Sequence, residues 1–250
     1  MTLQNDSQDP HDALTPKRRV FRTPFSQRAL SLVGLFFTVA ATCVLSVAAA
    51  AVFAADWRVG LFIAAVAVFT AALAGYVFRD LRGKLGLRVI LEEAEATFEL
   101  PSGRSLIHRP PAQHFVVAYS EMQAIEARYE GYRSLGMALM QRAYALRKTS
   151  GELIFLFEER ALATGFETSV FTELVAELLE RAQIPLRELG TVEGKGALLC
   201  AWGTEAPDWA APPLPRDQAL RLWRHAAGTG ALAMTLIILL VALRFGFGHG

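Results

Sequence analysis

Cysteine is scarce in this chain, which carries two in 250 residues, at Cys43 and Cys200. Two distant cysteines cannot build a disulfide framework, and they lack the close spacing of a cysteine-based zinc site. The sequence also lacks a nucleophile elbow, a phosphate-binding glycine loop and a dinucleotide fingerprint. These absences argue against the enzyme classes that such motifs mark.

Charge is missing from three long apolar stretches, residues 29–55, 59–78 and 226–243. The hydrocarbon core of a bilayer is roughly 30 Å thick, so a helix crosses it in about 20 apolar residues, with a tolerance of a few. We therefore expect three α-helical membrane spans, the first two forming a hairpin across a turn at residues 56–58. Because no span holds an Asp, Glu, Lys, Arg or His, transport by this chain alone is not expected.

Basic residues gather at one end of each expected span, and Lys and Arg near span ends favour the cytoplasmic side. Twelve flank that end, and Arg58 and Arg244 flank the other. The twelve are Lys17, Arg18, Arg19, Arg22, Arg28, Arg79, Arg82, Lys84, Arg88, Arg216, Arg221 and Arg224. This asymmetry predicts a multi-pass protein of the bacterial inner membrane, with its N-terminus and middle region cytoplasmic and residues 244–250 outside.

An export signal is the alternative for the N-terminal region, because Arg18-Arg19-Val20-Phe21 is similar to the core of a twin-arginine signal and small residues precede Asp56. The first apolar run, residues 29–55, is far longer than the roughly 7–15 residues of a signal-peptide core. A second apolar run also follows almost at once. We therefore favour an uncleaved hairpin.

Composition divides the rest of the chain. Residues 1–28 are predicted to be a disordered tail with a basic flank, because they bury too little to fold. Residues 83–188 have ordinary polar content and are predicted to form one cytoplasmic α+β domain. Glycine, alanine and proline enrich residues 189–216, which are predicted to be a linker. Residues 217–243 are predicted to form a short amphipathic helix that continues into the third span.

The predicted domain begins with short β-rich runs separated by turn residues. Its clearest hairpin crosses residues 148–151, where Gly151 can adopt the positive φ of a tight connection. Another hairpin is expected across Pro101-Ser102-Gly103. The expected strands are residues 87–91, 96–100, 105–108, 114–119, 124–129, 143–147 and 152–157.

One amphipathic helix follows these strands. Thr168 or Ser169 can cap its first turn, and Pro185 marks its end. Apolar residues from Val170 to Leu179 recur on one face, and charged residues take the other. Such a stripe indicates core packing, so we expect this helix to cover a strongly bent sheet.

The order of these elements resembles that of bacterial PH-like (pleckstrin-homology-type) domains found beside membrane spans. The resemblance covers roughly Gly83 to Gln183. It depends on the strand entry Tyr119 to Glu126, the hairpin Thr149-Ser150-Gly151 and the helix from Val170. It implies a bent antiparallel sheet or barrel capped by one C-terminal helix, and it raises the question of lipid headgroup binding. The third span departs from the simplest form of the family.

Charge limits what such a domain can bind. Residues 85–190 carry eleven basic residues and fifteen glutamates, so the region is acidic overall. An acidic surface does not favour nucleic acid, and it makes a lipid headgroup a less favoured partner. A local patch for a partner or headgroup is still possible. Its candidate residues are His108, Arg109, Arg133, Arg142, Arg147 and Lys148.

No catalytic, cofactor-binding or metal-binding residue is predicted. The pairs Glu92-Glu93 and Glu158-Glu159 would point to opposite faces of a strand, which suits solvation. His108 and His114 lie close in the chain, but no third ligand lies near them. Within the spans, Ala71 and Gly75 form a small-xxx-small pair and are the candidate helix-packing face.

We therefore expect a protein without enzymatic activity or cofactor, whose PH-like domain is a protein-interaction module. It would assist assembly or regulation of a membrane complex, through another membrane protein or self-association. The alternative is a component that binds a lipid or hydrophobic small molecule at the inner leaflet, with Arg109, Arg133 and His108 as polar contacts. A third hypothesis is a metal-dependent enzyme that uses His108 and His114.

Overall fold

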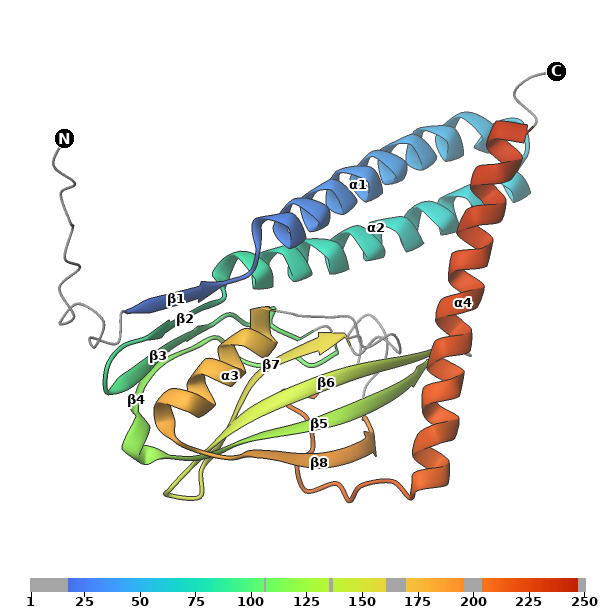
Figure 1. Ribbon diagram of the computed structural model, residues 1–250. Helices are drawn as coiled ribbons and strands as arrows, with labels where there is room; N and C mark the ends of the chain where they lie inside the picture. Colours follow the sequence, from blue (N-terminus) through green and yellow to red (C-terminus); the bar gives the residue numbers. More distant parts are fainter. Residues whose placement is uncertain (1–17, 106, 135–136, 161–169, 196–203, 247–250) are drawn as a thin grey trace, which may run out of the picture.

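The computed structural model describes residues 18–105, 107–134, 137–160, 170–195 and 204–246. Two long helices run side by side next to an α+β domain, and a third long helix stands at the end of that domain (Figure 1). The elements in chain order are β1 (Arg19–Arg22), α1 (Phe25–Phe53), α2 (Trp57–Gly86), β2 (Arg88–Leu91), β3 (Glu95–Leu100), β4 (Gln113–Ala118), the 3-10 turn η2 (Tyr119–Glu121), β5 (Met122–Ser134), β6 (Met137–Lys148), β7 (Leu153–Arg160), α3 (Val170–Ala182), β8 (Leu186–Glu193) and α4 (Arg216–Gly246).

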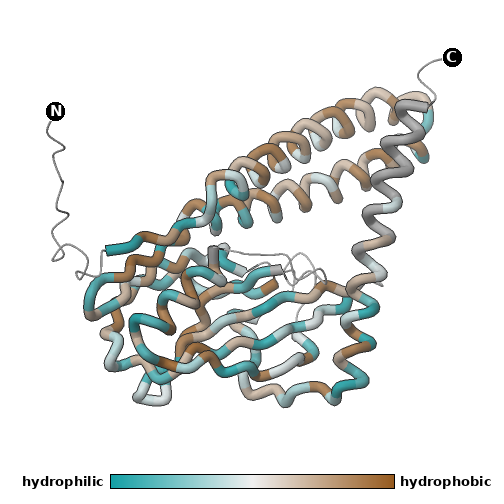
Figure 2. Tube along the Cα trace, viewed as in Figure 1, coloured by the Kyte–Doolittle hydropathy of each residue, from teal (hydrophilic) through white to brown (hydrophobic). Residues whose placement is uncertain are grey.

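The helices α1 and α2 form a hairpin, and both are long and apolar enough to cross a membrane. Figure 2 shows hydrophobic residues along most of their length, in contrast to the mixed surface of the domain. The Asp56 carboxylate accepts hydrogen bonds from the N–H groups of Arg58 at 2.9 Å and Val59 at 3.4 Å. This cap satisfies the first turn, so α2 begins at Trp57, inside the predicted turn.

Small residues at every seventh position form the buried face of α2. Gly60, Ala67 and Ala74 are buried there. The prediction that Ala71 and Gly75 form the packing face is therefore wrong for this hairpin, because both are exposed and nothing lies within 4 Å of a Cβ built on Gly75. Seven residues make nearly two turns, whereas Gly75 is turned by about 100° from Ala74.

The helix α4 is continuous over the predicted short helix and the predicted third span. Its first half packs on the domain: Leu222 is buried, and a Cβ on Gly131 of β5 would lie 2.0 Å from its Cδ2 atom. The rings of Trp223 and Tyr129 meet edge to face, with centroids 5.2 Å apart. Within the described residues α1 and α2 have the character of membrane spans. A spanning role for α4 stays a prediction.

The described strands form two four-stranded sheets, ordered β1-β2-β3-β4 and β7-β6-β5-β8. Neighbouring strands are antiparallel except β5 and β8, which are parallel. Both sheets and α3 contribute to one hydrophobic core, in which Phe98, Leu146 and Leu178 are almost fully buried. The α+β domain is confirmed. Its relation to a PH-type barrel stays a prediction.

Local sequence signals locate several elements correctly. Gly151 has φ 87°, and its N–H donates to Lys148 O at 2.9 Å in the β6–β7 hairpin. The helix α3 ends at Ala182, where Gln183 has φ 53° and the N–H of Ile184 donates to Leu179 O at 3.3 Å. The predicted caps at residues 168 and 169 lie outside the described residues.

Three predicted boundaries differ from the structure. The strand β1 lies in the predicted tail, where Val20 pairs with Ile90 of β2. The strand β8 runs past the predicted start of the linker and pairs with β5. The described residues of the predicted strand at 105–108, which are 105, 107 and 108, are not in a strand, because β3 pairs with β4 and the described residues between them form a loop. All three depend on partners distant in sequence, which local patterns do not report.

Candidate functional site

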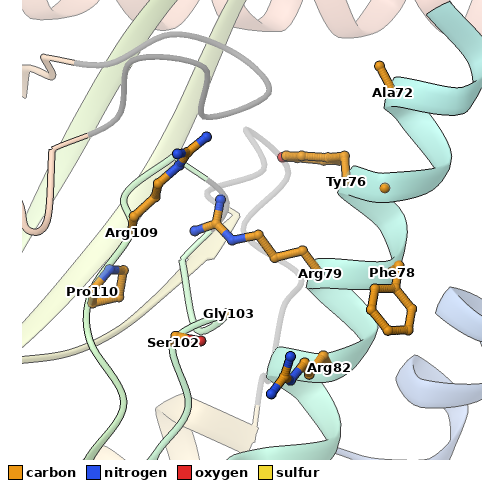
Figure 3. Close-up of a pocket in the computed structure, with 10 residues that line it drawn as sticks. Ala72, Tyr76, Phe78, Arg79, Arg82, Ser102, Gly103, Arg109 and Pro110 are labelled. Atoms are coloured by element: carbon orange, nitrogen blue, oxygen red, sulfur yellow. The ribbon is translucent and has the colours of Figure 1, made fainter. Parts of the chain in front are cut away.

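A pocket lies where the last turns of α2 meet the loop between β3 and β4 (Figure 3). Its volume is about 550 Å³, which suits a small-molecule site. We call it the junction pocket. Its lining residues are Ala72, Gly75, Tyr76, Phe78, Arg79, Arg82, Ser102, Gly103, Arg109 and Pro110.

Two glycines allow the helix and the loop to approach closely enough to form this pocket. A Cβ on Gly83 would lie 2.1 Å from Gly103 O, and a Cβ on Gly103 would lie 2.6 Å from Arg79 O. Real side-chain carbons do not come so close to backbone atoms, so the contact requires glycine on both sides. The pocket wall is therefore built from backbone against backbone.

Arg104 holds the loop in place. Its guanidinium donates to the carbonyl oxygens of Pro101 at 3.0 Å and Pro111 at 2.6 Å, and to the side-chain oxygen of Gln113 at 3.0 Å. It also lies over the ring of Phe155, 5.6 Å from the centroid. Burial lowers the pKa of Arg104 to about 10. These contacts tie both ends of the loop to the domain.

The junction pocket is cationic at one end and apolar at the other. Arg79 and Arg109 reach toward each other from α2 and from the loop, and Arg82 lies one turn further along α2 (Figure 3). Arg79 donates to the carbonyl oxygens of Ser105, at 3.2 Å, and His108. Within the described part of the chain, the side chains of Arg82 and Arg109 have no hydrogen-bond or ion-pair partner. Among the described residues, the lining includes no acidic side chain.

The predicted basic patch does not form as a free cationic surface. Arg109 lines the junction pocket, whereas each of the four predicted patch residues on β5 and β6 has a glutamate partner. His108 is buried, with 1% of its side chain exposed. The pairs are Arg133 with Glu193, Arg142 with Glu188, Arg147 with Glu126, and Lys148 with Glu152. Burial removes His108 from any surface patch, and a binding role for the four paired basic residues stays a prediction.

Local sequence patterns mark Arg79 and Arg82 only as basic flanks of a span and not as site residues. Their signal was position: they follow directly after the last apolar residue of α2, Phe78, on the same side as the domain. Nothing local indicated that the loop carrying Arg109 would fold back against them.

A cluster of polar side chains lies inside the domain, below the loop between β3 and β4. The Nε2 atom of His108 lies 3.4 Å from Glu130 Oε2 and 3.4 Å from Glu158 Oε1, and 2.8 Å from the Tyr132 hydroxyl. Ser105 donates to Glu158 Oε2 at 2.7 Å. We call His108, Glu130 and Glu158 the buried triad. Arg79 connects it to the junction pocket through the loop carbonyls.

Each acid of the buried triad has a different environment. Burial acts to raise the pKa of Glu130, but hydrogen bonds from His108 and Tyr132 and the charge of Arg128 outweigh it, so this pKa is lowered. Burial raises the pKa of Glu158 to about 7, against the opposing effects of His108 and Ser105. The prediction that Glu158 suits solvation is wrong, since 2% of its side chain is exposed.

The hypothesis of a metal site made by His108 and His114 does not match the described geometry. His114 lies on β4 opposite Glu99 and is exposed, whereas His108 is buried against Glu130 and Glu158. The two histidines therefore belong to different parts of the domain. The acidic partners of His108 come from β5 and β7, which the sequence spacing did not reveal.

Comparison with known proteins returns no relative. No protein-family model, no curated protein and no solved structure matches this chain. Its function is therefore argued from the two sites.

Proposed function

We propose that this protein is a membrane-anchored binding module that takes the phosphate headgroup of an anionic phospholipid in the junction pocket. The observation that carries the proposal is a pocket at the end of an apolar helix, whose described lining holds three arginines and no acid. Two of these arginines, Arg82 and Arg109, make no side-chain hydrogen bond or ion pair among the described residues. They are available to a ligand.

The chemistry of the pocket fits a phosphodiester with acyl chains. Arginine presents a planar fork of donors that matches phosphate oxygens, and its charge persists at any physiological pH. Ala72, Gly75 and Phe78 line the side of the pocket nearer the apolar part of α2, where lipid chains would lie. A headgroup bound here would therefore keep its chains parallel to the helix.

The orientation of the protein supports the same ligand. Basic residues predominate at the domain-side ends of the expected spans, which favours a cytoplasmic domain in a bacterial inner membrane. Anionic lipids give the cytoplasmic leaflet a negative surface potential, worth about 1 kcal/mol for each Lys or Arg near it. The net acidity of the domain does not oppose this, because local charge at the pocket decides headgroup binding.

Regulation of a membrane complex through a partner protein, without enzymatic activity, stays a prediction beside this proposal. The exposed face of α2 at Ala71 and Gly75 permits the close approach of another helix. Gly75 also lines the junction pocket, so a helix packed against Gly75 would compete with lipid chains there. The lipid proposal takes precedence because it rests on a defined pocket.

Loss of two arginines is expected to weaken lipid binding selectively. Full-length protein with Arg82→Gln and Arg109→Gln would be placed in nanodiscs of phosphatidylcholine with a minor fraction of phosphatidylglycerol. Hydrogen bonds to charged groups contribute about 1.5–3 kcal/mol each, so we expect phosphatidylglycerol retention to fall at least about tenfold. Native mass spectrometry of the released protein measures the retained lipid.

Arg133→Gln is the matched control, because Arg133 is 54% exposed and 3.9 Å from Glu193, away from the pocket. We expect this control to keep its lipid. Equal phosphatidylglycerol retention by the double variant and the natural protein would refute the proposal. Equal loss from the control would show that lipid binding depends on net charge and not on the pocket.

A further inference from the structure

We propose that His108, Glu130 and Glu158 form a binding site for a divalent transition-metal ion such as Zn²⁺ or Mn²⁺. One nitrogen and two oxygen atoms, one from each residue, lie within 4.8 Å of one another. Imidazole and carboxylate are the ligand types that such ions prefer. This site is separate from the junction pocket, and the proposal does not depend on lipid binding.

The separations within the triad fit metal ligands better than hydrogen bonds. Both distances from His108 Nε2 to the carboxylate oxygens are 3.4 Å. Hydrogen bonds between such atoms are usually about 2.7–3.2 Å long. A tetrahedral ion with bonds of about 2.0–2.1 Å separates its ligand atoms by about 3.3–3.4 Å. An ion bound between these three atoms therefore requires little change in the two distances from His108 Nε2 to the carboxylate oxygens.

One carboxylate oxygen in the triad has no hydrogen-bond partner. Glu158 Oε1 makes no hydrogen bond among the described residues, and only 2% of the Glu158 side chain is exposed to solvent. Buried polar atoms are nearly always satisfied, so an unsatisfied carboxylate oxygen facing a histidine nitrogen calls for a ligand. A cation at this point would satisfy Oε1 directly.

The outer atoms of the three ligands are already held in place. Thr204 donates its hydroxyl hydrogen to Ala206 O at 2.9 Å, so its oxygen accepts from Nδ1 of His108, also at 2.9 Å. In the metal-free protein Nε2 contacts the Tyr132 hydroxyl at 2.8 Å and Glu130 at 3.4 Å. An ion would replace these contacts and take the lone pair that Nε2 has in the neutral ring protonated on Nδ1. The other oxygen of each acid is held as well, by Ser105 for Glu158 and by Arg128 for Glu130. Such outer contacts orient the ligands of metal sites.

Charge favours a divalent ion at this position. Arg128 offsets one of the two carboxylates, whereas no ion pair joins Glu158 to an arginine or lysine of the described residues. A doubly protonated His108 that bridges both acids is the competing arrangement, since His108 would then supply the missing positive charge. The two arrangements differ in what replacement of Glu158 by an uncharged isostere would do.

The test uses the full-length chain in mild detergent, purified through a tag without histidine and stripped with a chelator. Addition of Zn²⁺ or Mn²⁺ is expected to leave one bound equivalent per chain by elemental analysis. We expect the Tm to rise by about 5–10 °C at an ion concentration about a hundredfold above Kd. Absence of stoichiometric metal with either ion would overturn the proposal.

Two variants locate the ion. Glu158→Gln keeps the shape of the side chain and an acceptor for Ser105, so we expect the metal-free Tm to stay level or rise while metal binding is lost. Tight metal binding that survives the Glu158→Gln change would contradict the proposal. A large fall in the metal-free Tm would also contradict it, and would favour a protonated His108 that bridges both acids. His108→Asn is expected to lose the metal as well.

His114→Asn is the matched control, because His114 is an exposed histidine on β4. It is expected to bind the ion as the natural protein does. Loss of metal from this variant would show that surface histidines hold the ion, and would overturn the assignment to the buried triad.

Discussion

Methionine in place of Arg128 is expected to lower the free energy of unfolding by about 3–5 kcal/mol, because it leaves a buried carboxylate without its cation. Arg128 donates to Glu130 Oε1 through Nε at 2.8 Å and Nη2 at 2.5 Å, and at most 2% of either side chain is exposed. Its Nη1 atom also donates to Asp208 O at 2.8 Å. The loss should lower the Tm of metal-free protein by about 6–20 °C.

Trp209 supplies a local readout for this variant. The Arg128 guanidinium lies 4.4 Å from its ring centroid, so removal of the charge should shift tryptophan emission as residues 204–211 lose their anchor. Adding Glu130→Gln to Arg128→Met removes the unpaired charge and should restore a large part of the lost stability. If the double variant were no more stable than the single one, unpaired charge would not be the cause.

Arg133→Met serves as the control for the same type of substitution. Its side chain is 54% exposed and lies 3.9 Å from Glu193, and exposed ion pairs of this kind contribute roughly 0–1 kcal/mol. We expect its Tm to stay within a few degrees of the natural protein. An equal loss at both positions would mean that burial of the Arg128–Glu130 pair does not decide its contribution.

Alanine at Gly83 and alanine at Gly75 are expected to act in opposite directions, although both positions lie on α2. A Cβ at Gly83 would meet Gly103 O at 2.1 Å, so the loop between β3 and β4 must move. Forced overpacking typically costs about 1–3 kcal/mol, and contact with backbone belongs at the upper end. Nothing lies within 4 Å of a Cβ at Gly75, where alanine should be neutral or gain up to about 1 kcal/mol of helix propensity.

Thermal melting of both variants in the same detergent measures this difference. The Gly83→Ala variant should also lose phosphatidylglycerol selectively, because displacement of the loop carries Arg109 away from Arg79 and Arg82. Unchanged stability of Gly83→Ala would show that the helix and loop are not in backbone contact. Destabilisation by Gly75→Ala would show that this face of α2 is already occupied.

Features that depend on neighbouring residues could be predicted from sequence. The two apolar runs that became α1 and α2 have no charge over a span's length, and a backbone in hydrocarbon must satisfy its own hydrogen bonds. Gly151 forms the turn of a hairpin through its local backbone preference. Gln183 and Pro185 end the helix α3 in the same way. The alternation of strands is likewise a local property, so β2, β3, β4 and β7 lie close to their expected positions, whereas β6 begins six residues before its expected start at residue 143.

Both candidate sites needed the tertiary structure. His108 belongs to a loop, Glu130 to β5 and Glu158 to β7, and only the folding of β5, β6 and β7 beneath the loop brings them together. The small residues of α2 show the same limit. Composition predicted a packing face, but the crossing of α1 over α2 chose Gly60 and Ala74 and left Gly75 exposed.

The sequence by itself therefore determined which segments are apolar, which residues form turns, and which residues end a helix. Those properties depend on interactions within a few residues. Tertiary contact decided which charges are paired. It gave most basic residues of β5 and β6 a glutamate each, buried Glu158 beside a histidine, and left Arg82 and Arg109 facing a pocket. Coulombic interaction and desolvation depend on distance and burial in space, and no spacing along the chain encodes either.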